Sequence, residues 1–117
     1  MAITTSTHDV ISSERVEGTS VYNAAGDKLG SIDELMINKR SGKVEYAVLE
    51  FGGFLGMGTD RYPLPWSMLD YDTDKDGYVV PLTKEQIDGA PRYTETTTPD
   101  YTPEYSQRIG SYYGVGI

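Results

Sequence analysis

The sequence predicts a mainly β fold, a small and strongly curved antiparallel β-barrel of five to six strands. Short apolar runs separated by Gly, Asp and Asn extend from about residue 16 to residue 82, and this spacing is typical of an all-β unit with close turns. In the second run the apolar period of two fails near Asp33 and Glu34, which indicates a β-bulge and sharp local curvature. The chain of 117 residues is long enough to bury one core without disulfides, and it contains no cysteine.

The expected strands cover residues 19–22, 29–38, 43–51, 60–66 and 78–82. Gly26 and Gly42 lie in the two connections that follow the first and second strands, where hairpin loops need a residue with positive φ. Such loops favour pairing between strands that follow each other in the sequence, so a meander is the simplest topology. The third strand has apolar residues on both faces, and we therefore expect it at the centre of the sheet.

A short helix is expected after the last strand. Thr83 is a suitable N-cap, Gln86 stands three residues later as in a capping box, and Gly89 and Pro91 predict the end of the helix after one to two turns. Beyond this point the composition shifts to Thr, Pro and Tyr. We therefore expect a flexible arm at residues 1–13, one barrel domain at residues 14–93 and a C-terminal tail at residues 94–117.

Four segments of the barrel region, taken in order, resemble the PRC-barrel family: DKLGSIDELMIN (27–38), SGKVEYAVLEFGGFLGMG (41–58), RYPLPWSML (61–69) and LTKEQIDGAPRY (82–93). Known relatives include the cytoplasmic domain of the photosynthetic reaction centre H subunit and the C-terminal domain of a ribosome maturation factor. The barrel serves interaction or assembly in both, so the resemblance implies a non-enzymatic module that contacts another protein or a second copy of itself. The sequence shows neither the membrane helix of the first relative nor the N-terminal domain of the second, so a role in photosynthesis or ribosome assembly is only an alternative.

Charge and composition narrow the function further. With 18 acidic and 10 basic residues the net charge is −8, which disfavours nucleic acid and anionic lipid surfaces as partners. We expect a soluble, cytoplasmic protein, because the first residues show no signal peptide and no run is long enough to span a bilayer. The one histidine, His8, lies in the expected arm, and no serine has a nucleophile-elbow context. We therefore expect no enzyme activity, no cofactor and no small-molecule substrate.

The acidic string DTDKDG (72–77) resembles the first half of an EF-hand calcium loop. Asp72, Asp74 and Asp76 would be its first ligands, but the twelfth position is Thr83 rather than a bidentate glutamate, and strand-like segments flank the loop. A hairpin turn explains the string better, with Asp side chains bonded to backbone amides and Gly77 as the left-handed residue. Weak calcium binding remains the alternative.

The segment FGGFLGMG (51–58) lacks both the spacing and the lysine of a phosphate-binding loop. Its glycines allow Phe54, Leu55 and Met57 to point outward as an apolar patch. We expect this patch either to fold over one end of the barrel or to contact a protein partner.

The tail contains a second expected helix, over residues 103–109, with a threonine N-cap, a proline at its first position and a stop at Gly110. Apolar and aromatic residues recur every fourth position along it and continue beyond it. The candidate interaction residues of the tail are Tyr101, Tyr105, Ile109, Tyr112 and Tyr113. We expect this stripe to dock across a two-fold homodimer; packing on its own barrel, or disorder, is the alternative.

Overall fold

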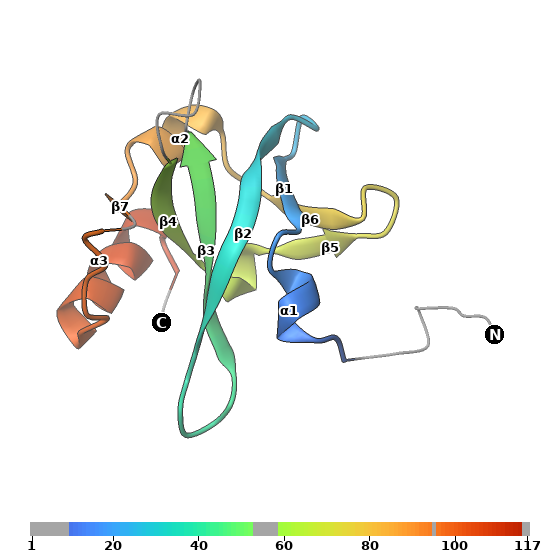
Figure 1. The fold of residues 1–117 in the computed structure, drawn as a ribbon. Coiled ribbons are helices and arrows are strands. Elements are labelled where there is room, and N and C mark those ends of the chain that lie inside the picture. The colour runs from blue at the N-terminus through green and yellow to red at the C-terminus, as the bar shows by residue number, and fades with distance from the viewer. Residues whose placement is uncertain (1–9, 53–58, 95, 116–117) are drawn as a thin grey trace.

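The computed structural model describes residues 10–52, 59–94 and 96–115 (Figure 1). In chain order the elements are α1 (Ser13–Val16), β1 (Ser20–Asn23), β2 (Lys28–Ile37), β3 (Val44–Gly52), β4 (Thr59–Pro65), the 3-10 helix η3 (Trp66–Met68), β5 (Asp70–Asp72), β6 (Gly77–Val80), α2 (Lys84–Asp88), β7 (Tyr93–Thr94) and α3 (Pro103–Tyr113). The mainly β class is confirmed, and each of the five expected strands has its counterpart, in β1, β2, β3, β4 and β6. The two further strands, β5 and β7, are too short to give a sequence pattern.

The seven strands found in the described residues form one sheet in the order β5-β6-β1-β2-β3-β4-β7. In the described part of the chain the pairing ends at β5 on one side and at β7 on the other, so a closed barrel is not confirmed. The meander expectation is wrong for one pair, because β6 lies parallel to β1. After β4 the chain passes through the 3-10 helix and β5 to the other side of β1. There β6 pairs with β5 and lies next to β1. β2 rather than β3 is the middle strand.

β2 bends where the sequence predicts it to bend. Its register against β3 shifts between Ile32 and Glu34, which confirms the expected bulge. Just before this point Gly30 lies so close to β3 that an added Cβ would be 1.9 Å from the carbonyl oxygen of Glu50. The close approach of β2 to β3 thus requires the missing side chain at Gly30, two residues before the register shift.

The inner face of the curved sheet and α2 enclose the apolar core. Its largest contributors are Val21, Leu29, Ile32, Leu49, Tyr62, Leu64, Tyr78, Val80, Leu82 and Ile87. The expected capping box of α2 is confirmed: the Thr83 hydroxyl accepts from the Gln86 amide at 3.2 Å, and the Gln86 side chain accepts from the Thr83 amide at 2.8 Å. This box fixes the start of α2 and so places Ile87 in the core with no exposed surface.

The helix α1 begins at Ser13, after the N-cap Ser12. It spans the boundary expected from the sequence between a flexible arm (1–13) and the barrel domain (14–93). Val16 at its end is buried in the core, whereas Val10 and Ile11 before it are exposed. Within the described ranges, no helix has both the length and the apolar character that crossing a membrane requires.

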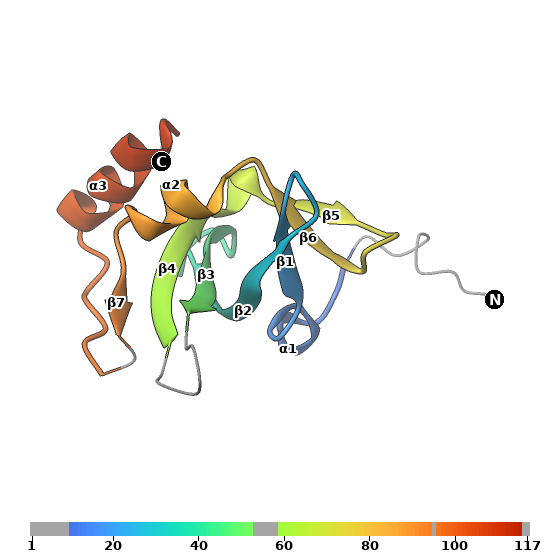
Figure 2. The same cartoon turned by 90° about the horizontal axis from the view of Figure 1, so that it is seen from above.

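α3 is longer than the sequence predicts. It continues through Gly110, which is buried inside the helix instead of ending it, and stops at Gly114, whose φ of 70° lies in the left-handed region. The glycine that ends a helix is the one with positive φ, and packing rather than composition decides which of two nearby glycines takes that conformation. Figure 2 shows α3 beside α2 and β4, at the end of the molecule away from α1.

Candidate interaction surface

The two faces of β3 have different surroundings. Side chains alternate along a strand, and Ala47 and Leu49 belong to the apolar core, whereas Tyr46 and Val48 point to the other side, here called the outer face. Tyr46 is nevertheless 3% exposed and Val48 is 0% exposed. The sheet is therefore covered on this face too.

A group of tyrosines lies on the outer face. The ring of Tyr101, from the C-terminal tail, lies 5.5 Å from the ring of Tyr46 and 5.2 Å from that of Tyr105. Tyr93 of β7 completes the group, with its hydroxyl 3.0 Å from that of Tyr101. We call Tyr46, Tyr93, Tyr101 and Tyr105 the tyrosine cluster. It joins β3, β7 and the segment leading into α3.

α3 continues the covering from the tyrosine cluster toward α2. Ile109 has no exposed surface, and Tyr113 packs against the edge of the core. The Tyr112 hydroxyl donates a hydrogen bond to the Gln86 carbonyl oxygen of α2. The stripe expected from Tyr101, Tyr105 and Ile109 thus packs on its own chain, one of the outcomes considered from the sequence, and its contact with a second copy stays a prediction.

The tail is held by side chains alone. In the described part of the chain, the backbone amides and carbonyls of residues 98–115, here called the docked tail, hydrogen-bond only within that segment. Thr102 caps α3 by accepting from the Tyr105 amide, and Gly114 closes its other end, so the helix satisfies its own termini. Among the described residues, two side-chain hydrogen bonds join the docked tail to the rest of the chain, one between the hydroxyls of Tyr93 and Tyr101 and one from the Tyr112 hydroxyl. The docked tail is therefore structurally separable from the sheet.

Docking also buries polar atoms without partners. The hydroxyls of Tyr46, Tyr105 and Tyr113 are buried and have no hydrogen-bond partner among the described residues. Each such hydroxyl costs about 1–3 kcal/mol, whereas burying a side chain such as Ile109 contributes about 1.5–3 kcal/mol. These opposing terms are of similar size, so the docked tail is held less firmly than its apolar contacts alone would suggest.

Burial also shifts the titration of the tail. Loss of hydration raises the pKa of Tyr105 to about 12. It likewise raises the pKa of Tyr113, and that of Tyr101, where the hydrogen bond to Tyr93 adds to the effect. Each of these hydroxyls keeps its proton more strongly when the tail is docked than when it is in water.

Raising the pH above 10 is therefore expected to release the docked tail. Between the ordinary pKa of 10.0 and the raised value of about 12 for Tyr105, the docked state holds protons that the released state has lost. Docking stability is thus complete below pH 10 and falls as the pH rises through 12. Hydrogen exchange of α3 and the absorbance of tyrosinate, both followed against pH, measure this. Tyr105→Phe should reduce the alkaline loss, and an unchanged pH profile in that variant would contradict the assignment.

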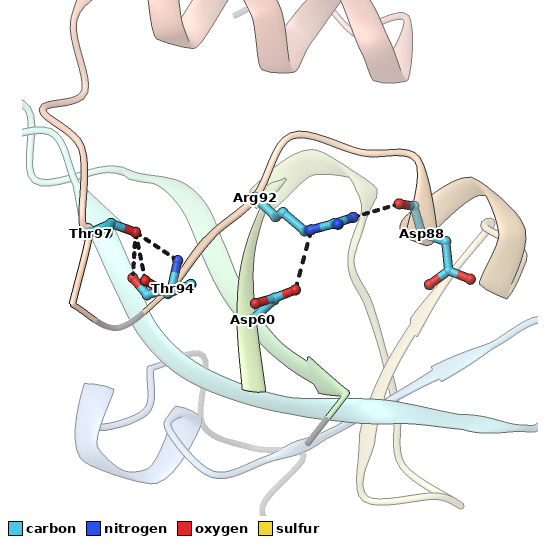
Figure 3. Close-up of polar contacts among 5 residues, drawn as sticks. All are labelled: Asp60, Asp88, Arg92, Thr94 and Thr97. Atoms are coloured by element: carbon cyan, nitrogen blue, oxygen red, sulfur yellow. Dashed lines mark hydrogen bonds and ion pairs between the residues drawn. The ribbon is translucent and has the colours of Figure 1, made fainter. Parts of the chain in front are cut away.

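Polar contacts fix the chain just before the docked tail (Figure 3). Arg92 Nε lies 3.2 Å from Asp60 Oδ2 of β4, and Arg92 Nη1 donates to the Asp88 carbonyl oxygen at 2.8 Å. Further on, the Thr94 amide donates to the Thr97 hydroxyl at 3.0 Å and the Thr97 amide to the Thr94 carbonyl oxygen at 3.1 Å, closing a tight turn. Arg92 is therefore joined to β4 and to the end of α2, and Thr97 is hydrogen-bonded to Thr94 of β7.

A second ion-pair group lies on the outer face of the sheet, because Arg61 alternates with the core residue Tyr62 along β4. Arg61 of β4 is 9% exposed, and its Nε lies 3.2 Å from Asp33 Oδ2 while its Nη2 lies 3.1 Å from Glu50 Oε2. Tyr93 is the register partner of Arg61. This group links β2, β3 and β4 beside the tyrosine cluster.

An open cleft of about 830 Å³ lies between residues 89–92 and α3. Arg92 borders it from the sheet side, and Arg108 and Ser111 from the helix. α3 therefore contacts the body along part of its surface only.

The acidic loop has the geometry of a turn. Asp72 Oδ1 accepts from the amides of Asp74 at 2.9 Å and Lys75 at 3.3 Å, and the Tyr71 hydroxyl donates to Asp76 Oδ1. The left-handed residue is Asp76, with a φ of 51°, and not Gly77 as the sequence suggests. Gly77 is needed for a different reason, since an added Cβ would lie 2.7 Å from the Ser20 carbonyl oxygen of β1. Among the described residues no group of three or more His, Cys, Asp or Glu is placed to hold a metal ion.

Removing the Asp72 side chain tests the turn. Asp72→Ala is expected to lower the free energy of unfolding by about 1 kcal/mol, because two backbone amides lose their acceptor. Asp74→Ala, at an exposed position in the same loop, is the matched control and should change it by less than about 0.5 kcal/mol. Urea unfolding with and without calcium measures both. A stabilisation by calcium that both variants abolish would favour the calcium interpretation instead.

Of the other sequence-based candidates, Phe54, Leu55 and Met57 lie outside the described residues. Sequence reasoning missed Tyr46 and Tyr93, which the fold brings to the tail. Tyr46 could have been found, because it alternates with core residues on an internal strand and so needs a cover of its own. Nothing local in the sequence marks Tyr93, whose position depends on the pairing of β7 with β4.

Two comparisons with known proteins complete the description. The model of the PRC-barrel domain matches residues 8–87, more than half of the chain. An uncharacterised protein of Deinococcus radiodurans is 25% identical over 76 residues, which cover 65% of this chain and 27% of that protein. This chain therefore spans about a quarter of that relative's length. The matched family region contains β1 to β6 and most of α2, and the docked tail lies outside it.

Proposed function

Because the chain belongs to the PRC-barrel family, we propose that it is a non-enzymatic protein-interaction module whose ligand is an amphipathic helix. The docking surface is the outer face of β3 and β4 with the tyrosine cluster. One observation carries this proposal: the surface already holds a helix, α3, through side-chain contacts and without any backbone hydrogen bond among the described residues. A helix from another chain with the same stripe would find the same contacts.

The composition of the surface supports protein binding over catalysis. Aromatic residues with a polar tip are enriched at protein interfaces, where the ring is buried and the hydroxyl finds a partner. The buried hydroxyl of Tyr46 lacks a partner under the present helix, so a ligand helix that supplies an acceptor there would bind better than α3 does. We place this activity in the cytoplasm, away from anionic lipid surfaces, which a net charge of −8 repels.

Binding in trans tests the proposal. A labelled peptide of residues 98–117 is titrated with the full chain carrying Ile109→Asp, in which the surface is vacated, and fluorescence anisotropy reports binding. We expect saturable binding to this variant and weaker binding to the unmodified chain, whose own tail competes. A peptide with the same Ile109→Asp change is the control and should not bind. If the variant keeps the β-sheet by circular dichroism yet binds neither peptide, the surface is not a helix-docking site.

A further inference from the structure

The first three residues of the docked tail separate Thr97 from Tyr101, which contacts β3 and β7. Thr97 is hydrogen-bonded to Thr94 of β7, and Tyr101 already lies against Tyr46. Residues 98–100 are therefore the hinge, and in the described structure they make no hydrogen bond to the body. A short hinge restricts how the tail can return to its own sheet.

Building on the proposed helix-docking function, we infer that two copies of this chain exchange docked tails, so that α3 of each copy covers the outer face of the other. The exchange keeps every contact seen within one chain, including the stacking of Tyr101 on Tyr46 and the bond from Tyr112 to Gln86. Only the hinge changes conformation. Such an exchange is a low-cost route to a two-fold dimer, since no new surface has to be complementary.

Three features of the tail make it suited to exchange. α3 carries its own caps in Thr102 and Gly114, so it leaves the sheet as an intact helix. No backbone ladder has to break among the described residues. The buried hydroxyls of Tyr105 and Tyr113 lack hydrogen-bond partners among the described residues in the docked state. When the tail leaves the sheet, both hydroxyls can hydrogen-bond to water again. The tail can therefore leave and return without unfolding the sheet.

The ligand helix that fits this surface best is α3 of a second copy, because each copy has both the helix and the outer face that binds it. Two chains of net charge −8 repel each other, so salt should favour the exchanged dimer by screening this repulsion. A tail tethered to its own chain competes at an effective concentration of about millimolar for a flexible linker. The exchange is therefore expected to be most visible at high protein concentration and high ionic strength.

Cross-linking between single-cysteine variants tests the exchange directly, because the chain contains no cysteine. In the docked state a Cβ added at Gly89 would lie 3.0 Å from the Tyr112 hydroxyl. A full chain with only Gly89→Cys is mixed at high concentration and high salt with a full chain with only Tyr112→Cys, and a short bis-maleimide is added. Exchange predicts a cross-linked product of twice the chain mass of 12.9 kDa. Lys39→Cys replaces Tyr112→Cys in the control mixture, which should give far less product.

Absence of the cross-linked product in the test mixture, with efficient cross-linking inside a chain that carries both cysteines, would overturn the exchange.

Shortening the hinge gives a second, independent test. Deleting residues 98–100 removes about 10 Å of reach, so the tail can no longer close on its own sheet. We expect the shortened chain to be dimeric by sedimentation equilibrium and to become monomeric again when Ile109→Asp is added. A shortened chain that stays monomeric contradicts the inference. If the peptide of residues 98–117 binds in trans while both tests of exchange fail, the helix-docking function stands and only the exchange is lost.

Discussion

Replacing Gly30 with alanine is expected to prevent the curved sheet from forming. An added Cβ would lie 1.9 Å from the Glu50 carbonyl oxygen, and the nearest obstacle is backbone in the next strand rather than a flexible side chain. Relief would require the middle strand β2 to move by more than 1 Å away from β3, which breaks the ladder on which the core is built. We expect the free energy of unfolding to fall by more than about 4 kcal/mol. Losses of this size are rare among single substitutions and occur where a side chain overlaps fixed atoms.

The matched control for Gly30→Ala is Gly42→Ala. Gly42 has a φ of 78°, and nothing lies within 4 Å of an added Cβ. It therefore measures only the cost of a left-handed alanine, about 1–2 kcal/mol. Urea unfolding followed by far-ultraviolet circular dichroism compares the two. Losses of equal size would show that conformational freedom, and not the close approach of β2 to β3, explains Gly30.

Ile109→Asp is expected to release the docked tail while leaving the sheet folded. Ile109 has no exposed surface, so a carboxylate there would be buried without a partner or would force α3 into water. Losing the isoleucine alone costs about 2–5 kcal/mol in a packed site, enough to shift a docking equilibrium by more than tenfold. The tyrosine cluster should then become exposed, because Tyr101 and Tyr105 belong to the same segment.

Hydrogen exchange read residue by residue measures this release. The amides of residues 103–113 should lose protection, and those of β2 and β3 should keep it. Gln107→Asp, at an exposed position of the same helix that borders the open cleft, is the matched control and should leave the protection of α3 nearly unchanged. If Ile109→Asp also removed protection from the sheet, the docked tail would be part of the cooperative core and not a separable segment.

Local patterns predicted the local structure well. The bulge in β2 follows from a break in the apolar period, and the capping box of α2 from the spacing of Thr83 and Gln86, since both are decided by neighbours in the chain. The stripe of Tyr101, Tyr105 and Ile109 was likewise predictable from helical spacing. What it packs against was not, because that depends on the position of β4 and β7.

The remaining differences arise where distant segments decide the outcome. The parallel pairing of β6 with β1 depends on the path through η3 and β5, and no local signal distinguishes it from a meander. The sequence predicts that the second helix ends at Gly110, but Gly110 is buried within α3 and the helix continues past it. Gly114 takes the left-handed conformation that ends the helix. In the acidic loop the positive φ falls on Asp76, whereas Gly77 is required by its close approach to Ser20 of β1.

The order of the elements along the chain has a consequence for synthesis. α3 follows all seven strands, so the sheet can form on the ribosome before the helix that covers its outer face has been made. During that interval Tyr46 and its neighbours are open to other chains and to chaperones. Nascent copies are close together at this stage, so a tail can first meet the sheet of a neighbouring chain as well as its own.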